Sequence, residues 1–219
     1  MSNVEEEEDD VEEEDKEEDI KVILVGDPGT GKTSLINVSV GEKFKEASVS
    51  TLLSTFVQKK FQKDDKDYIL NIWDTAGQEK YRAMTKIFIK NSKIVIFVYA
   101  INSKASFEGL QKFWFHSIKD ALGEEPIYGI VGNKCDMFLK EEVKEAEGKQ
   151  YAEENGMKFQ LVSAKEDPNG FIDFLYSLFI DFLNKDTGPK RKTIFIDKDN
   201  GEEVKKKKNV VSNNILLIF

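Results

Sequence analysis

The hydrophobic positions of the chain fall into short runs that are separated by polar or amphipathic stretches. Six runs are four to six residues long and rich in β-branched or aromatic side chains, which is typical of buried strands. They occupy residues 20–25, 56–61, 68–73, 94–99, 127–131 and 159–162. A polar segment, 63–66, separates the second run from the third, so these two predict a pair of neighbouring strands.

The stretches between these runs show helical spacing. A helix is predicted to begin near Ser34, and an amphipathic helix is predicted over residues 106–122. A polar helix is predicted over 141–155, and a helix with an apolar stripe over 171–183. Strands that alternate with helices indicate an α/β fold with a largely parallel sheet covered on both faces. Such sheets bind ligands at the carboxyl ends of their strands.

The net charge of −9 is distributed unevenly along the 219 residues. Residues 1–19 contain 13 acidic side chains and one lysine, which leaves +3 for the rest of the chain. A segment with so much like charge buries too little apolar surface to fold, so residues 1–19 are predicted to be an acidic disordered tail. A binding arm for a basic partner is the alternative. The folded domain is predicted to span 20–185, followed by a variable tail, 186–219.

The sequence favours a cytoplasmic protein. No apolar run reaches the roughly 18–20 residues that span a bilayer, and the N-terminus lacks a signal-peptide pattern. The single cysteine, Cys135, excludes an internal disulfide. The lysines at 205–208 and the apolar residues 215–219 predict weak, conditional contact with endomembranes without lipidation, because no cysteine follows Cys135.

The first motif with recognisable chemistry is a glycine-rich loop between a predicted strand and a predicted helix. It reads Gly26-Asp27-Pro28-Gly29-Thr30-Gly31-Lys32-Thr33 and is followed by Ser34. Glycines let backbone amides surround phosphate oxygens, and the helix N-terminus adds positive potential. Lys32 is expected to reach the β- and γ-phosphates, and Thr33 to bind Mg²⁺. A glycine-rich turn without a ligand is the alternative.

Two further loops indicate which base is bound. Asn133-Lys134-Cys135-Asp136 follows the strand 127–131, and Ser163-Ala164-Lys165 follows the strand 159–162. The Asp136 carboxylate is suited to accept two hydrogen bonds from guanine, a donor pair that adenine lacks. A site built on such bonds discriminates by about 10⁴–10⁵-fold. A backbone amide of the Ser163 loop would meet the guanine oxygen. GTP and GDP are therefore the predicted ligands.

A third motif follows the strand 68–73 and reads Asp74-Thr75-Ala76-Gly77-Gln78-Glu79. Asp74 is expected to hold Mg²⁺ through water, and the Gly77 amide to bond the γ-phosphate. Gln78 is expected to orient the attacking water.

Together these motifs resemble the Ras superfamily of small GTPases, most of all its Rab family, over Lys21 to about Asn184. The resemblance implies a P-loop NTPase small-GTPase fold, with a mostly parallel six-stranded sheet and helices on both faces. It implies that Thr51, 19 residues after Lys32 and 23 before Asp74, binds Mg²⁺ and the γ-phosphate. It also implies that Phe44 lies against the guanine edge.

The resemblance also implies partners. Exchange factors, GTPase-activating proteins and effectors would contact the switch regions, where Phe56, Trp73 and Phe88 match an effector-binding aromatic triad. Ordinary packing of the strand pair is the alternative role for these three rings. A monomer is expected, and no nucleic-acid partner.

Several positions depart from the Rab pattern. Leu52-Leu53-Ser54 replaces Ile-Gly-Val, Ala100 replaces an aspartate, and no prenylation cysteine lies near the C-terminus. Pro28 stands where serine or glycine is usual; it lacks an N–H and has a restricted φ, so it would alter the hydrolysis rate.

Two functions follow from these residues. The first is a GTP-hydrolysing switch in Rab-like vesicle trafficking, which is slow without a partner. Its catalytic groups are Lys32, Thr51 and Gln78. The second is a nucleotide-dependent binding scaffold that does not hydrolyse GTP, and Pro28 is the main residue in its favour.

Overall fold

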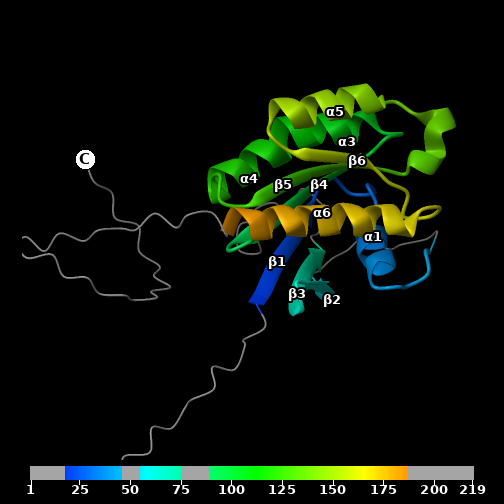
Figure 1. Cartoon of the computed structure of the whole chain (residues 1–219). Coiled ribbons are helices and arrows are strands. Elements are labelled where there is room, and N and C mark those ends of the chain that lie inside the picture. Colours follow the sequence, from blue (N-terminus) through cyan, green and yellow to red (C-terminus); the bar gives the residue numbers. More distant parts are fainter. Residues whose placement is uncertain (1–17, 46–54, 75–88, 187–219) are drawn as a thin grey trace, which may run out of the picture. The chain divides into compact units, whose positions relative to one another are not determined.

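The computed structural model of the chain describes residues 18–45, 55–74 and 89–186 (Figure 1). Its strands form a single sheet in the order β2-β3-β1-β4-β5-β6. The strands are β1 (Glu18–Val25), β2 (Thr55–Lys63), β3 (Lys66–Asp74), β4 (Ile94–Ala100), β5 (Ile127–Asn133) and β6 (Lys158–Leu161). All neighbours are parallel except β2 and β3, which are antiparallel. The predicted six-stranded, mostly parallel sheet is confirmed.

Helices cover both faces of this sheet (Figure 1). One face carries α1 (Lys32–Ser39) and α6 (Pro168–Asp186). The other carries α3 (Lys104–Gly109), the π-helical segment η2 (Leu110–Trp114), α4 (Phe115–Leu122) and α5 (Glu145–Glu154). A 3₁₀ helix, η3 (Cys135–Lys140), follows β5. Within the described ranges, no helix is long and apolar enough to cross a membrane.

The central strands are apolar because both of their faces are covered. Every residue of β4 is buried. Along β1, Val22 and Leu24 pack into the core beneath α1 and α6, whereas Ile23 and Val25 pack into the core on the opposite face. This alternation follows from the two-residue period of a strand, and it explains why the sequence of a doubly covered strand reads as a continuous apolar run.

The predicted strand pair is a hairpin with a two-residue turn. Asp64 and Asp65 both have positive φ angles, 51° and 60°, as a type I′ turn requires. Aspartate tolerates this left-handed conformation better than most residues. Lys63 pairs with Lys66 beside the turn, and the ladder runs to Thr55 opposite Asp74.

Several predicted boundaries were wrong; α6, for example, spans Pro168–Asp186 instead of 171–183. β1 starts at Glu18, two residues inside the predicted tail, because backbone pairing with β3 does not require apolar side chains. The helix predicted over 106–122 starts at Lys104 and contains a π segment. The helix predicted from 141 starts at Glu145, since the N–H groups of Glu142 and Val143 both donate to the Ile101 carbonyl at 2.8 and 3.0 Å.

Candidate functional site

The glycine-rich loop joins the end of β1 to α1, and its glycines are required sterically. Gly26, Gly29 and Gly31 have φ angles of 150°, 76° and 92°. A Cβ atom on Gly26 would lie 2.1 Å from the Val98 carbonyl oxygen, and one on Gly31 would lie 2.3 Å from the Asn133 amide nitrogen. No side chain of the described residues caps α1 at Gly31. The first N–H groups of α1 are therefore suited to an anion.

Lys32 is held inside this loop. Its side chain is almost fully buried, and Nζ donates to the carbonyl oxygens of Gly26 at 2.8 Å and Asp27 at 2.9 Å. Burial lowers the pKa of the Lys32 ammonium to about 8, although the nearby Asp74 and Asp27 carboxylates act in the opposite direction. The loop thus keeps a buried cation at the place where the backbone is arranged for phosphate.

A hydroxyl and a carboxylate meet beside this cation. Thr33, on the first turn of α1, donates from Oγ1 to Asp74 Oδ2 at 2.6 Å, and Asp74 is buried at the end of β3. Two residues that are 41 positions apart, each predicted to bind Mg²⁺, are therefore brought together. Hydroxyl, carboxylate and phosphate oxygens are the hard ligands that Mg²⁺ prefers, so this pair fits a magnesium ion.

The Asn133 loop contacts the glycine-rich loop directly. Asn133 is buried; its Nδ2 donates to the Thr30 carbonyl at 2.8 Å, and its Oδ1 accepts from the Ala164 N–H at 3.3 Å. Lys134 has a left-handed φ of 65°, and its Nζ donates to the Gly29 carbonyl at 2.6 Å. These two side chains join three loops that are far apart in the sequence.

Asp136 is oriented by the third loop. Ser163 donates from Oγ to Asp136 Oδ1 at 2.6 Å. The same hydroxyl oxygen accepts from the N–H groups of Lys165 and Glu166 at 3.3 and 3.0 Å. The Cys135 N–H donates to the Val162 carbonyl at 3.1 Å, which holds the two loops side by side. A carboxylate is thus held at the loop end where the sequence predicts recognition of guanine.

The site lies at the carboxyl edge of the sheet. It consists of the glycine-rich loop with its lysine, the threonine–aspartate pair and the Asp136 carboxylate. Residues 21–178 match the Ras family. The chain belongs to the Ras family. Proteins of this family are GTP-binding switches, and they typically hydrolyse GTP and bind exchange factors, activating proteins and effectors.

Named relatives of this Ras-family protein are Rab proteins. It is 36% identical over 165 residues to Ras-related protein Rab-21 of Geodia cydonium, which covers 75% of this chain and 69% of the relative. It is 35% identical over 175 residues to Ras-related protein Rab-13 of Bos taurus, covering 78% and 84%. It is 37% identical over 145 residues to Ras-related protein Rab5A of Oryza sativa subsp. japonica, covering 66% and 71%.

Two of the three predicted effector-binding rings lie together in this Ras-family structure. Phe56 and Trp73 are paired across β2 and β3, their rings stack with centroids 4.9 Å apart, and Phe56 is 50% exposed. Phe44 is partly buried and packs against the core beneath α1 and α6. Its predicted contact with guanine stays a prediction.

Some predicted residues fall outside the described ranges. These are Thr51, Gly77, Gln78 and Phe88, most of the acidic tail, and the lysines at 205–208. Their predicted roles stay predictions.

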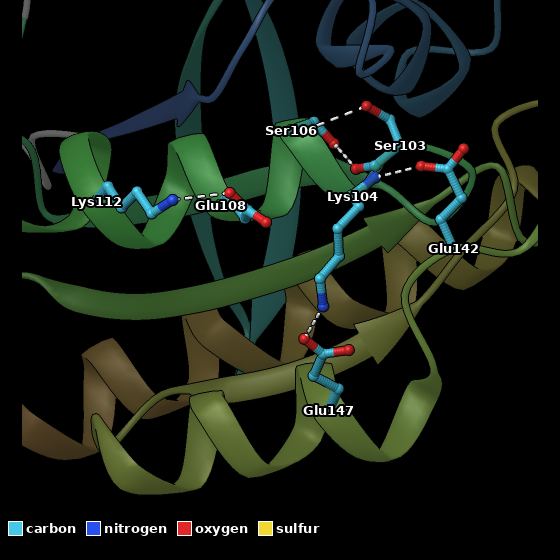
Figure 2. Close-up of polar contacts among 7 residues, drawn as sticks. All are labelled: Ser103, Lys104, Ser106, Glu108, Lys112, Glu142 and Glu147. Atoms are coloured by element: carbon cyan, nitrogen blue, oxygen red, sulfur yellow. Dashed lines mark hydrogen bonds and ion pairs between the residues drawn. The ribbon is translucent and has the colours of Figure 1, made fainter.

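Two groups of contacts near the site were not predicted. Figure 2 shows the first, in which Glu142 accepts from the Lys104 N–H at 2.7 Å and Glu147 pairs with the Lys104 ammonium. These contacts attach the segment after Asp136 to the start of α3. The second group joins Asp27 to Trp114. The sequence predicts Trp114 only as one of the apolar positions of the helix over 106–122, and such spacing does not show where an indole N–H points.

Proposed function

We propose that this Ras-family protein binds GTP and GDP with Mg²⁺ and hydrolyses GTP slowly, switching the shape of two loops as the γ-phosphate is lost. The observation that carries the proposal is the joining of three loops around one buried lysine and one oriented carboxylate. Phosphate recognition and base recognition are thereby combined in one site.

Each described residue has a distinct role in this proposal. Lys32 balances charge on the β- and γ-phosphates, and Asp136 accepts from guanine. Thr33 and Asp74 would hold Mg²⁺, which supplies neutralisation of phosphate charge when it is bound. The N–H groups of residues 27 and 29–34 surround the phosphates, and Pro28 supplies none. Asn133 and Lys134 act chiefly on the loop geometry, since both contact the glycine-rich loop.

The hydrolytic step is assigned to residues outside the described ranges. Gln78 orients a water molecule that attacks the γ-phosphorus; the bond between this phosphorus and the β–γ bridging oxygen breaks, and GDP and phosphate leave. Thr51 and the Gly77 amide hold the γ-phosphate and are released after its loss. No cis-acting arginine is present near Thr51, so rates near ~10⁻⁴ s⁻¹ are expected without a partner.

A Rab-like role in vesicle trafficking fits the named relatives and the half-exposed Phe56–Trp73 stack. Aromatic side chains are enriched in binding interfaces. Effectors, exchange factors and activating proteins would therefore bind on this side of the hairpin. Membrane contact would be weak and salt-dependent, through the lysines at 205–208.

A scaffold that binds nucleotide without hydrolysis is the rival function. Pro28 favours it, because proline lacks an N–H in the phosphate-binding loop and is exposed there. Single-turnover hydrolysis of GTP by the full chain discriminates the two. Phosphate release that Gln78→Leu abolishes supports hydrolysis. Tight GTP binding with no release, restored by Pro28→Gly, supports the scaffold.

A further inference from the structure

The carboxylate of Asp27 is held by a distant helix. Trp114 donates from Nε1 to Asp27 Oδ1 at 2.8 Å, across 87 positions of sequence. We propose that Trp114 is a positioning residue that holds the glycine-rich loop through Asp27 and thereby slows the release of bound nucleotide. The proposal rests on the proposed function, since it concerns the same nucleotide site.

The helix that carries Trp114 is locally rewound. α3 ends at Gly109, the π segment η2 runs from Leu110 to Trp114, and α4 follows without a break. A π turn closes hydrogen bonds from i to i+5, so it holds one more residue than an α turn and changes the direction of the side chains that follow. Trp114 is the last residue of this segment and is 1% exposed. Its indole is therefore fixed by packing.

Gly109 is a second, independent indication that this helix accommodates the Asp27 carboxylate. Its backbone is ordinary helix, with φ −60° and ψ −39°, so glycine is not required for conformation. A Cβ atom there would, however, lie 2.3 Å from Asp27 Oδ2. Glycine is disfavoured within helices relative to alanine. The helix thus leaves space for one carboxylate oxygen and donates to the other.

The backbone of Asp27 connects this contact to the phosphate cradle. Its carbonyl accepts from Lys32 Nζ and from Thr30 Oγ1, both at 2.9 Å. Holding the Asp27 side chain therefore restrains the carbonyl that positions the Lys32 ammonium. A loop that is already ordered loses less conformational entropy when it binds a ligand, so loss of the indole contact should loosen the bound nucleotide.

The test is the release rate of fluorescent GDP from the full chain, chased with excess unlabelled GDP. Trp114→Phe keeps a ring but removes the donor, and Asp27→Ala removes the acceptor. Each is expected to speed release about tenfold, as loss of a charge-assisted hydrogen bond would. The double variant should be no faster than either single variant. Asp27→Asn keeps an oxygen acceptor but loses the charge, so it should speed release less than Asp27→Ala.

Tyr128→Phe is the matched control. It removes a partly buried hydroxyl that donates to the Gly123 carbonyl at 2.6 Å, at the start of β5. It should leave the release rate unchanged. Wild-type release rates for both Trp114→Phe and Asp27→Ala, or effects that simply multiply in the double variant, would overturn the proposal.

A second variant and a second readout separate this proposal from the proposed function. Gly109→Ala should speed release in the wild-type background but have no further effect beside Asp27→Ala. Without nucleotide, the Trp114 indole N–H resonance, identified by its loss in Trp114→Phe, should shift in Asp27→Ala. If the wild type binds no GDP, the proposed function fails, and an unmoved indole resonance would overturn the pairing itself.

Discussion

The phosphate side and the base side of the site are assembled in different ways. Most of the phosphate side comes from one contiguous segment, Gly26 to Thr33, and among the residues that the structure describes only Asp74 is added to it from elsewhere. The base side depends on two loops, at 133–136 and 163–165, which are held together by a serine hydroxyl and backbone contacts. One side is therefore largely local, and the other is made by tertiary contacts.

This difference shows which part of the site a short motif specifies and which part depends on contacts between distant loops. Glycine conformations and a helix N-terminus follow from neighbouring residues, so a short motif suffices for the phosphate side. The orientation of Asp136, which follows β5, depends on Ser163 in the loop after β6, the next strand along the chain. Asn133 and Lys134 couple the two sides because both donate to carbonyls of the glycine-rich loop.

The largest expected effect is on base selectivity. Asp136→Asn replaces a carboxylate acceptor by a group that also donates, which suits the C2 oxygen of xanthine. The preference for guanine over xanthine nucleotides should change by about 10⁴-fold, measured by competition between GDP and XDP. Asp173→Asn, an exposed aspartate on α6, is the control. An unchanged preference in Asp136→Asn would break the assignment of the base side.

The next effect concerns the phosphate side. Lys32→Ala should reduce GDP affinity by about 10²–10³-fold, because truncating a buried, hydrogen-bonded charge costs several kcal/mol. Lys60→Ala is the control, since Lys60 forms an exposed ion pair with Asp67 on the hairpin. Ion pairs on the surface contribute little to stability, so the GDP affinity of Lys60→Ala should match that of the wild type. Equal losses in the two variants would contradict a specific role for Lys32.

The pH dependence of binding should report the same ammonium. The pKa of Lys32 is about 8 in the free protein, and bound phosphate would raise it. The bound state then keeps the proton, so affinity is complete below pH 8 and falls above it by up to about tenfold per pH unit. Titration calorimetry from pH 7 to 9 measures this. The dependence attributable to Lys32 should disappear in Lys32→Ala; its persistence there would assign it to another group.

A smaller effect is expected from the residue that orients Asp136. Ser163→Ala should reduce GDP affinity about tenfold, as loss of a hydrogen bond to a charged group would. Ser177→Ala is matched to it, because the Ser177 hydroxyl donates to the Phe174 carbonyl at 2.8 Å within α6. Equilibrium binding of fluorescent GDP compares them. An unchanged GDP affinity in Ser163→Ala would mean that backbone contacts alone hold Asp136 in position.

The last substitution, Tyr99→Phe, is expected to change the stability of the protein without changing its affinity for GDP. Within the described residues, the buried Tyr99 hydroxyl has no hydrogen-bond partner; burial raises the pKa of this phenol. Tyr99→Phe should raise the free energy of unfolding by about 1 kcal/mol and leave GDP affinity unchanged. Tyr128→Phe removes a hydroxyl that is hydrogen-bonded, so it should lower the free energy of unfolding by a similar amount. Urea unfolding measures both, and destabilisation by Tyr99→Phe would reveal an unrecognised partner.

The strands and the position of the site at the carboxyl edge of the sheet were predictable from the sequence, whereas several boundaries of helices and strands were not. A doubly covered strand such as β4 is apolar at every position, so its sequence alone identifies it. The start of α5 was missed because Glu142 and Val143 bond to Ile101, a contact that local propensity does not encode. The π segment was missed because one extra residue in a turn hardly alters an apolar stripe.

From the sequence alone, the α/β fold, the glycine-rich loop and the positions of Thr33 and Asp74 near strand ends could be predicted, because short patterns of residues specify them. Only the tertiary structure decided how Ser163 orients Asp136, how Lys134 reaches Gly29 and how Trp114 holds Asp27. The physical reason is that a hydrogen bond between distant residues depends on the direction of each side chain after packing. Motif spacing places a residue at an edge of the sheet but does not specify that direction.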